Sequence, residues 1–363
     1  MASASDRTFY GGISAIGSSA LISLFQPAAQ EDTRVPRILG YGLALLCLIW
    51  VLHDFHIVRA LRDFARVSWR WVLIGMAFDV LSYIMQAIRW RYLLAPFGKV
   101  RLTRSVRAIF SGLFANLIFP LRPGELLRSY VLSDSEGISF GLVLGSVGVE
   151  RLVDLVIATA SLGVVSLLVD LPRQFRRVAD ILGVATLVLL TIVVIAIFYL
   201  ELKVGTSAKI ESKARSAPGK VMSALVALHA MGTAPSFYPA LLFSVLMPFC
   251  QVVGLWCMMI AYGLHLSFLV GVVVLVVINL GVSLPNAPAN VGSYQFFCVL
   301  GLSVFEIEKT TAAGFSIFAF LALNLPFVFL GFAALVRSGM SFRSMRERVS
   351  NLPSELPGAG APL

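Results

Sequence analysis

Charged residues are scarce in this chain of 363 residues, where Asp, Glu, Lys and Arg make up 13% of the sequence. An ordinary soluble protein carries about 25%. Hydrophobic residues make up 58%, and the mean hydropathy is +0.88. These values exclude a soluble globular enzyme and a disordered chain, and apolar runs of about 18 residues or more recur along the sequence. The composition predicts an all-α integral membrane protein.

Cysteines and the common catalytic motifs are also lacking. The four cysteines lie inside apolar stretches without CxxC spacing, so we expect buried thiols and no disulfide or metal site. There is no GxxxxGK[ST] loop, no GxGxxG turn, no GxSxG and no HExxH. No soluble region is long enough to form a catalytic domain. We therefore expect a protein that is not an enzyme and that uses no cofactor and no metal ion.

Basic residues outnumber acidic ones, with 29 Lys and Arg against 19 Asp and Glu and a net charge of +10. They gather between apolar spans, which favours the anionic membrane surface as a partner over nucleic acid. Three basic segments, Arg89–Arg107, Glu201–Lys220 and Arg337–Arg348, predict that both termini are cytoplasmic in a cell (inner) membrane. The four arginines of residues 59–70 would then face outward, and this loop argues against the orientation.

Apolar segments predict about eight transmembrane helices, two of them broken. The uninterrupted spans are expected at Ile38–His53, Trp71–Ile88, Ile138–Val169, Ile181–Leu200, Phe237–Tyr262, Ser267–Leu284 and Thr310–Val336. Two segments, Ala108–Phe119 and Val291–Phe305, are too short for about 30 Å of hydrocarbon, so we expect half-helices or re-entrant hairpins. Residues 1–37 are expected to form a loose N-terminal segment, 38–337 the transmembrane domain, and 338–363 a basic, then disordered cytoplasmic tail.

The two interrupted segments resemble each other. Each has an Asn on the entering helix, then two prolines three residues apart and a nearby glycine. These residues are Asn116, Pro120, Pro123 and Gly124 in the first segment, and Asn279, Pro285, Pro288 and Gly292 in the second. Paired broken helices in the two halves of a chain indicate a transporter-like inverted repeat around a central site.

Ionisable residues lie near the middle of the predicted span Ile138–Val169, where a charge costs at least a few kcal/mol unless it is paired or hydrated. They are Glu150, Arg151 and Asp154. Asp154 shares a helix face with both of the others, at spacings of three and four. The triad either keeps a net charge of −1 or draws a cation from elsewhere in the chain.

A second charged group follows the first break. Arg122, Glu125 and Arg128 fall on one face if the chain turns helical at Pro123, with Glu125 in the first turn. Arginine near exposed helix N–H groups is suited to phosphate. We expect both charged groups to line one cavity. The alternative is that Arg122 or Arg128 pairs with Glu150 or Asp154 to join two helices, and the two interpretations are compatible.

Weaker polar signals occur elsewhere in the predicted spans. Asp79, Tyr83 and Gln86 recur at helical spacing and are expected to face the bundle interior as packing contacts. The amide residues of the broken segments are expected to satisfy unwound backbone and are the remaining candidate substrate-binding residues. These candidates are Asn116, Asn286, Asn290 and Gln295.

Three motifs carry a resemblance to a known family: NLIFPLRPGELLR at Asn116–Arg128, ERLVD at Glu150–Asp154 and LPNAPANVGSYQ at Leu284–Gln295. Together they resemble the lysylphosphatidylglycerol synthase transmembrane family of flippase-like proteins, over roughly residues 38–337. The resemblance implies about eight helices with two re-entrant segments and the movement of a lipid or its head group between leaflets. It implies that six residues line the head-group cavity: Arg122, Glu125, Arg128, Glu150, Arg151 and Asp154.

The third motif departs from the family pattern, since Ala289-Asn290 replace a glycine pair and Gln295 stands where an acid often falls. The aminoacyl-transferase domain of the full synthetases is not found among the 363 residues, so the resemblance implies a stand-alone member.

Three functions remain open from the sequence. The first is a translocase for lipids with an anionic or polar head group. The second is a non-catalytic accessory subunit for a lipid- or glycolipid-modifying enzyme. The third is an intramembrane transferase with Glu150 or Asp154 as base.

Overall fold

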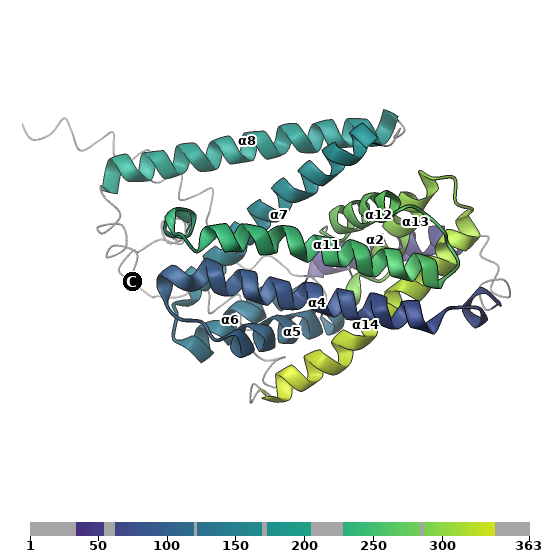
Figure 1. Ribbon diagram of the computed structural model, residues 1–363, viewed down its shortest axis with the longest axis horizontal. Helices are drawn as coiled ribbons and strands as arrows, with labels where there is room; N and C mark the ends of the chain where they lie inside the picture. Colours follow the sequence, from purple (N-terminus) through teal and green to yellow (C-terminus); the bar gives the residue numbers. More distant parts are fainter. Residues whose placement is uncertain are drawn as a thin grey trace, which may run out of the picture.

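The computed structural model describes residues 34–53, 62–119, 122–168, 173–204, 228–283 and 287–337. The expectations for residues 1–33 and for the tail from 338 to 363 lie outside these ranges. Every long element in them is a helix, which confirms the predicted all-α class. Figure 1 shows most of the helices lying alongside one another, with one long helix running along the upper edge.

Four of the described helices are long and apolar enough to cross a membrane. They are α4 (Trp69–Leu94), α7 (Phe140–Leu168), α11 (Phe237–Ala261) and α14 (Lys309–Arg337). Three further helices have shorter apolar stretches: α2 (Arg34–Leu52), α8 (Arg173–Val204) and α12 (Phe268–Val282). Each contains or closely matches a predicted uninterrupted span, and the boundaries differ most at α8, which begins eight residues before Ile181, and at α4, which continues six residues past Ile88.

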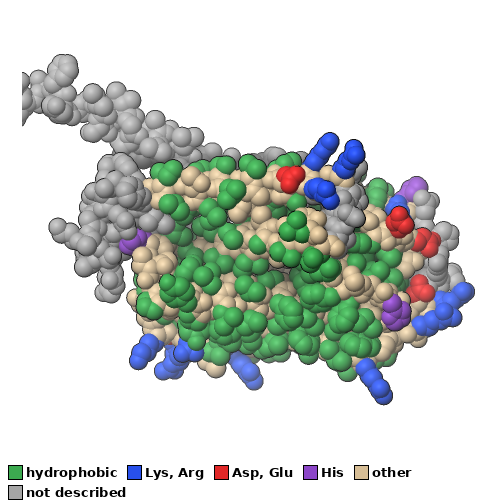
Figure 2. All heavy atoms as spheres, turned by 45° about the horizontal axis from the view of Figure 1, so that its top comes forward, with side chains coloured by type: hydrophobic (Ala, Val, Ile, Leu, Met, Phe, Trp, Pro, Cys, Tyr) green, Lys and Arg blue, Asp and Glu red, His purple; other side chains and the backbone are tan. Residues whose placement is uncertain are grey.

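Apolar side chains cover the outside of the bundle. Leu46, Leu167 and Phe329 are each about two-thirds exposed or more. Figure 2 shows a broad hydrophobic face with Lys and Arg gathered at its margins. A surface that is apolar between two charged margins matches a bilayer, because the hydrocarbon core contains no water to hydrate polar side chains. The four cysteines are buried and unpaired, as the sequence predicts.

Helices α4 and α11 pack side by side through small residues (Figure 1). A Cβ added at Gly75 of α4 would lie 2.9 Å from the carbonyl oxygen of Gly254 on α11. Such close backbone approach is the usual way in which transmembrane helices gain van der Waals contact.

The first interrupted segment forms an antiparallel hairpin of two short helices, α5 (Leu102–Ile118) and α6 (Gly124–Glu136). At its base, the backbone N–H of Arg101 donates to Glu136 Oε1 over 2.8 Å. Near its tip, Gly112 and Gly124 touch, and a Cβ on either would collide with the other's carbonyl oxygen. Pro123 was expected to be the first helical residue, but it lies at the N-cap of α6, one position before the helix begins at Gly124.

The second interrupted segment forms another hairpin, from α12, the short 3₁₀ turn η2 (Pro288–Asn290) and α13 (Ser293–Ser303). Gly301 packs against Val274 and Gly281 against Phe297, so the two helices run antiparallel. Helix α13 is shorter than the expected Val291–Phe305 because Gly292, at φ +85°, precedes its first residue.

The tips of the two hairpins touch. Arg122 adopts φ +53° just before α6, and its Nη1 donates to the carbonyl oxygen of Val282, the last residue of α12, over 2.7 Å. A helix C-terminus carries unsatisfied carbonyls and a partial negative charge, which an arginine complements. The two segments that resemble each other in sequence therefore meet in the structure.

Candidate functional site

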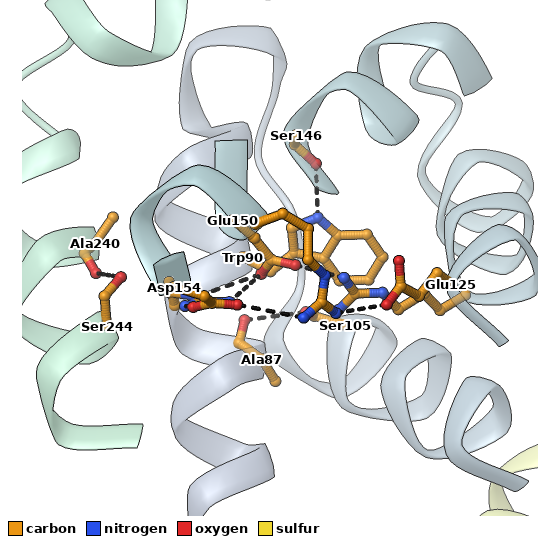
Figure 3. Close-up of polar contacts among 12 residues, drawn as sticks. Ala87, Trp90, Ser105, Glu125, Ser146, Glu150, Asp154, Ala240 and Ser244 are labelled. Atoms are coloured by element: carbon orange, nitrogen blue, oxygen red, sulfur yellow. Dashed lines mark hydrogen bonds and ion pairs between the residues drawn. The ribbon is translucent and has the colours of Figure 1, made fainter. Parts of the chain in front are cut away.

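A buried ion-pair centre lies on α7 at Glu150, whose side chain has no solvent exposure. Its Oε2 is 2.5 Å from Arg128 Nη2 of α6, and its Oε1 is 3.3 Å from Arg89 Nη2 of α4. Figure 3 shows Glu150 among these groups, with Trp90 beside it. This buried carboxylate joins three helices through its two guanidinium partners. Removing one member of such a buried ion pair destabilises the protein, because the other charge is left buried without a partner.

The centre continues outward as a chain of alternating charges. Arg89 Nη1 is also 2.5 Å from Asp154 Oδ1, Asp154 Oδ2 is 3.5 Å from Arg151 Nη1, and Arg151 Nη2 is 2.7 Å from Glu125 Oε1. The order is Arg128, Glu150, Arg89, Asp154, Arg151 and Glu125. The first three side chains are at most 5% exposed, whereas Asp154 is 27%, Arg151 49% and Glu125 34% exposed. We call these six residues the charge chain.

Trp90 holds the buried end of the charge chain in place. Its Nε1–H donates to Ser146 Oγ on α7 over 2.7 Å, and the guanidinium of Arg128 lies 4.8 Å from the centre of its ring. The ring has no solvent exposure. A cation above an indole ring is favourable, and more so where water is excluded. The Trp90 ring and Glu150 together leave Arg128 little freedom to move.

A cavity of about 320 Å³ lies against the exposed part of the charge chain. Its polar wall includes six of the sequence-predicted site residues: Asn116, Arg122, Glu125, Arg128, Arg151 and Asp154. Its other walls are mainly apolar and come from α7, α11 and α12. They include Leu155, Ile157, Met247, Val252, Leu275 and Val276. The cavity therefore has a charged part and an apolar part.

The formal charges around the cavity do not cancel. The charge chain holds three arginines and three carboxylates, and Arg122 adds one further positive charge. Arg122 donates to the carbonyl of Val282, while its buried Nε has no hydrogen-bond partner in the described part of the chain. One uncompensated guanidinium in a low-dielectric site attracts an anion.

Both interpretations of the charged groups hold in part. Arg128 pairs with Glu150 and joins α6 to α7, as the structural alternative predicts. Glu150 lies behind the cavity and does not line it. Arg151 and Asp154 form the expected contact on one helix face and do line it. Whether the cavity residues bind a substrate stays a prediction.

The amide residues play different parts. Asn116 Oδ1 accepts the N–H of Gly124 over 2.8 Å, and Gln295 Oε1 accepts that of Gly292 over 2.7 Å. Each thus caps the second helix of its hairpin, and Asn116 also lines the cavity. Asn290 and Gln295 lie away from the cavity wall, and Asn286 lies outside the described residues.

Asp79, Tyr83 and Gln86, which form the polar stripe of α4, face the bundle interior, as predicted. Asp79 and Gln86 are buried, and Tyr83 and Gln86 line the cavity together with Asn279 of α12. These cavity positions go beyond the packing role that the helical spacing indicates.

Arg89 is the site residue that sequence reasoning missed. The basic segment Arg89–Arg107 was expected to be a cytoplasmic loop, and this is wrong at its start because α4 continues to Leu94 and buries Arg89 completely. Two signals could have found it. Arg89 lies three residues after Gln86, on the same polar stripe, and the triad of α7 needed a cation from elsewhere.

Metal ligation has no support in the ranges that the structure covers, where no three His, Cys, Asp or Glu residues form a group that could hold a metal ion.

Comparisons with known proteins identify the family to which the chain belongs. A sequence model of the family described as "Lysylphosphatidylglycerol synthase TM region" matches residues 37–331. "Glycosyltransferase AglD" of Haloferax volcanii is 33% identical over 87 residues, which are 24% of this chain and 14% of that protein. The chain thus spans only a small part of the length of this relative. No solved structure matches. Since the family match covers most of the sequence, the chain belongs to the lysylphosphatidylglycerol synthase TM region family, as the motifs predict.

Proposed function

We propose that this protein is an inner-membrane translocase that moves a lipid with an anionic head group between leaflets, without covalent chemistry. Its family and the name of its relative point to lipid or glycolipid metabolism in a membrane. The observation that carries the proposal is the cavity of about 320 Å³, with a charged part beside an apolar part.

The division of the cavity fits the two parts of a lipid. The charged wall has an excess of one positive charge at Arg122, which suits a head group with one negative charge. The apolar wall from α7, α11 and α12 suits the first part of the acyl chains. A cavity of this volume holds a head group rather than a whole lipid, so the chains would extend into the bilayer.

The hairpin tips are the natural gate of such a translocase. In this proposal both hairpins are re-entrant and belong to an inverted repeat, with tips that meet at the bond from Arg122 to Val282. A phosphate bound by Arg122 would compete with that carbonyl for the guanidinium. Head-group binding would thereby loosen one hairpin tip from the other.

The proposed orientation places both termini in the cytoplasm. Arg107, near the start of α5, has its Nη1 3.5 Å from the carbonyl oxygen of Arg337 at the end of α14. Two of the basic segments that predict the cytoplasmic side thus lie at the same end of the bundle. Because α5 and α6 both have their base at that end, this hairpin would dip in from the cytoplasm.

The proposal is tested by reconstitution in vesicles. We expect the purified protein to accelerate the movement of a fluorescent phosphatidylglycerol, and Arg122→Ala to reduce the rate at least tenfold while the protein remains folded. Arg101→Ala, at the exposed base of the hairpin, is the matched control and should keep the rate. Normal translocation by folded Arg122→Ala would contradict the mechanism.

An accessory subunit is the second candidate, favoured by the short match to a glycosyltransferase. It predicts that the chain co-purifies with a separate lipid-modifying enzyme and moves no lipid in vesicles. A transferase with Glu150 as base is disfavoured, since Glu150 is paired with two guanidinium groups and does not line the cavity.

A further inference from the structure

Four amide side chains line the cavity beside its charged residues. They come from four different helices and are Gln86 of α4, Asn116 of α5, Gln251 of α11 and Asn279 of α12. A phosphate needs the guanidinium of the cavity, and acyl chains need its apolar wall, but neither needs these amides. Inside a membrane-embedded bundle, an amide is costly to keep unless a ligand, water or the protein hydrogen-bonds it.

Two of the amides have no protein partner. Gln86 is 6% exposed, and neither its side chain nor that of Asn279 makes a hydrogen bond with the residues that the structure describes. Asn116 uses its oxygen to accept the N–H of Gly124, which leaves its NH₂ group as a donor. These side chains keep hydrogen-bonding capacity for a molecule in the cavity.

Gln86 and Asn279 lie close to the charged residues along their helices. Gln86 is three residues before Arg89 on α4, and Asn279 is three residues before Val282 on α12. The carbonyl oxygen of Val282 accepts the Nη1 of Arg122 over 2.7 Å. Three residues of helix span about 5 Å along the axis. A head group with its phosphate at Arg122 therefore has its remaining part within reach of the amides.

Helix α11 adds hydrogen-bonding groups to the same cavity. Ser244, Pro248 and Gln251 line it at helical spacing. Pro248 has no N–H, so the carbonyl oxygen of Ser244, four residues earlier, lacks its helical partner. The hydroxyl of Ser244 donates to the carbonyl oxygen of Ala240 over 2.8 Å (Figure 3), and its oxygen is still able to accept. These acceptors complement the donors of the amides.

The described wall of the cavity offers no free carboxylate to a positively charged head group. Glu125 is paired with Arg151, and Asp154 is paired with Arg89 and Arg151. An ammonium group only donates hydrogen bonds and needs a negative charge beside it. Amides both donate and accept, as hydroxyl groups do. The uncharged polar groups of the cavity therefore suit hydroxyl groups better than an amine.

We propose that the head group of the transported lipid is a phosphodiester of a sugar or another polyol, with the phosphate at Arg122 and the hydroxyl groups bound by the four amides. The inference rests on the proposed function and names its substrate class. The cavity of about 320 Å³ lies at the lower end of small-molecule pockets, which measure about 300–1,000 Å³, so a phosphate alone does not fill it.

The first experiment uses the wild type and a series of lipids with the same acyl chains. Phosphatidylethanol, phosphatidylglycerol and phosphatidylinositol each carry one phosphodiester charge, and the number of hydroxyl groups on the head group rises in this order. We expect the affinity of the purified protein in detergent to rise in the same order, by about tenfold or more from the first lipid to the last. A site that hydrogen-bonds hydroxyl groups discriminates against analogues that lack them.

The second experiment repeats the series with Gln86→Leu and Asn279→Leu. We expect each variant to bind phosphatidylinositol about tenfold more weakly and to keep its affinity for phosphatidylethanol, because only the hydroxyl contacts are lost. Asn324→Leu is the matched control. It removes an amide of the membrane-crossing helix α14 that does not line the cavity, and it should keep the wild-type preference.

The outcomes separate this inference from the proposed function. Equal affinity of the wild type for the three lipids overturns the polyol site and leaves the anionic-lipid translocase standing. An equal loss for all three lipids in both amide variants also overturns it, since that is the effect of a structural role. Tighter binding of phosphatidylethanolamine than of phosphatidylinositol contradicts the charge argument. If none of the three anionic lipids binds, the proposed function fails together with the inference.

Discussion

The two helical hairpins share an architecture but differ in charge. In each, an entering helix ends at a proline-containing break, a glycine begins the return, and an amide side chain caps the second helix. The first hairpin contributes Arg122, Glu125 and Arg128 to the site, whereas α12 and α13 contain no charged residue. The second offers the Val282 carbonyl to the first. The shared architecture thus supplies the geometry, and one half supplies the electrostatics.

The largest effect is expected when the charge that joins the first hairpin to α7 is removed, because the second hairpin has no such ion pair in the described residues. Glu150→Ala leaves Arg128 buried without a carboxylate partner and Arg89 with Asp154 alone, so we expect a loss of about 3–5 kcal/mol in the free energy of unfolding. Glu125→Ala, at the exposed end of the charge chain, should cost about 0–1 kcal/mol. Reversible unfolding in mixed detergent measures both. Equal effects would show that burial does not separate the two ends.

A smaller effect should distinguish how the two hairpins are packed. Gly124→Ala drives a methyl group into the Gly112 carbonyl and should cost about 1–3 kcal/mol, because backbone cannot rotate away. Gly281→Ala meets the ring of Phe297, a side chain that can shift, and should cost less. Gly148→Ala on α7 has open space and should gain up to about 1 kcal/mol of helix propensity. Thermal unfolding of the three variants ranks them, and a reversed order would refute the packing argument.

The smallest effect tests where the hairpins should be alike. Asn116→Ala and Gln295→Ala each remove a side-chain acceptor from the start of a hairpin's second helix, so each should cost about 1 kcal/mol. Hydrogen exchange of the Gly124 and Gly292 amides reports the loss locally. A large effect at one site and none at the other would mean that the resemblance of the two caps is superficial.

Hydrophobic patterning was sufficient to predict the apolar helices, because apolar runs are stable in a bilayer wherever they occur in the sequence. Every predicted uninterrupted span corresponds to a helix, and the two interrupted segments lie in hairpins. The patterning did not show that α12, expected as an uninterrupted span, is the first arm of the second hairpin, and it did not predict the polar helix α6. The charged residues of α7 were recognised because a charge at membrane depth demands a partner. Arg89 was missed for a related reason: arginine at the end of an apolar run is usual at the membrane surface, and a pattern read along one helix does not show how far that helix continues.

Composition and spacing along the chain were enough to establish the membrane class, the family, the broken segments and the two charged motifs. The three-dimensional arrangement was needed to show which charges pair, that Glu150 lies behind the cavity and that Arg122 reaches the end of α12. Pairing depends on the distance between helices that are far apart in sequence. The close approaches that set those distances are made by glycines, whose neighbours the sequence does not reveal.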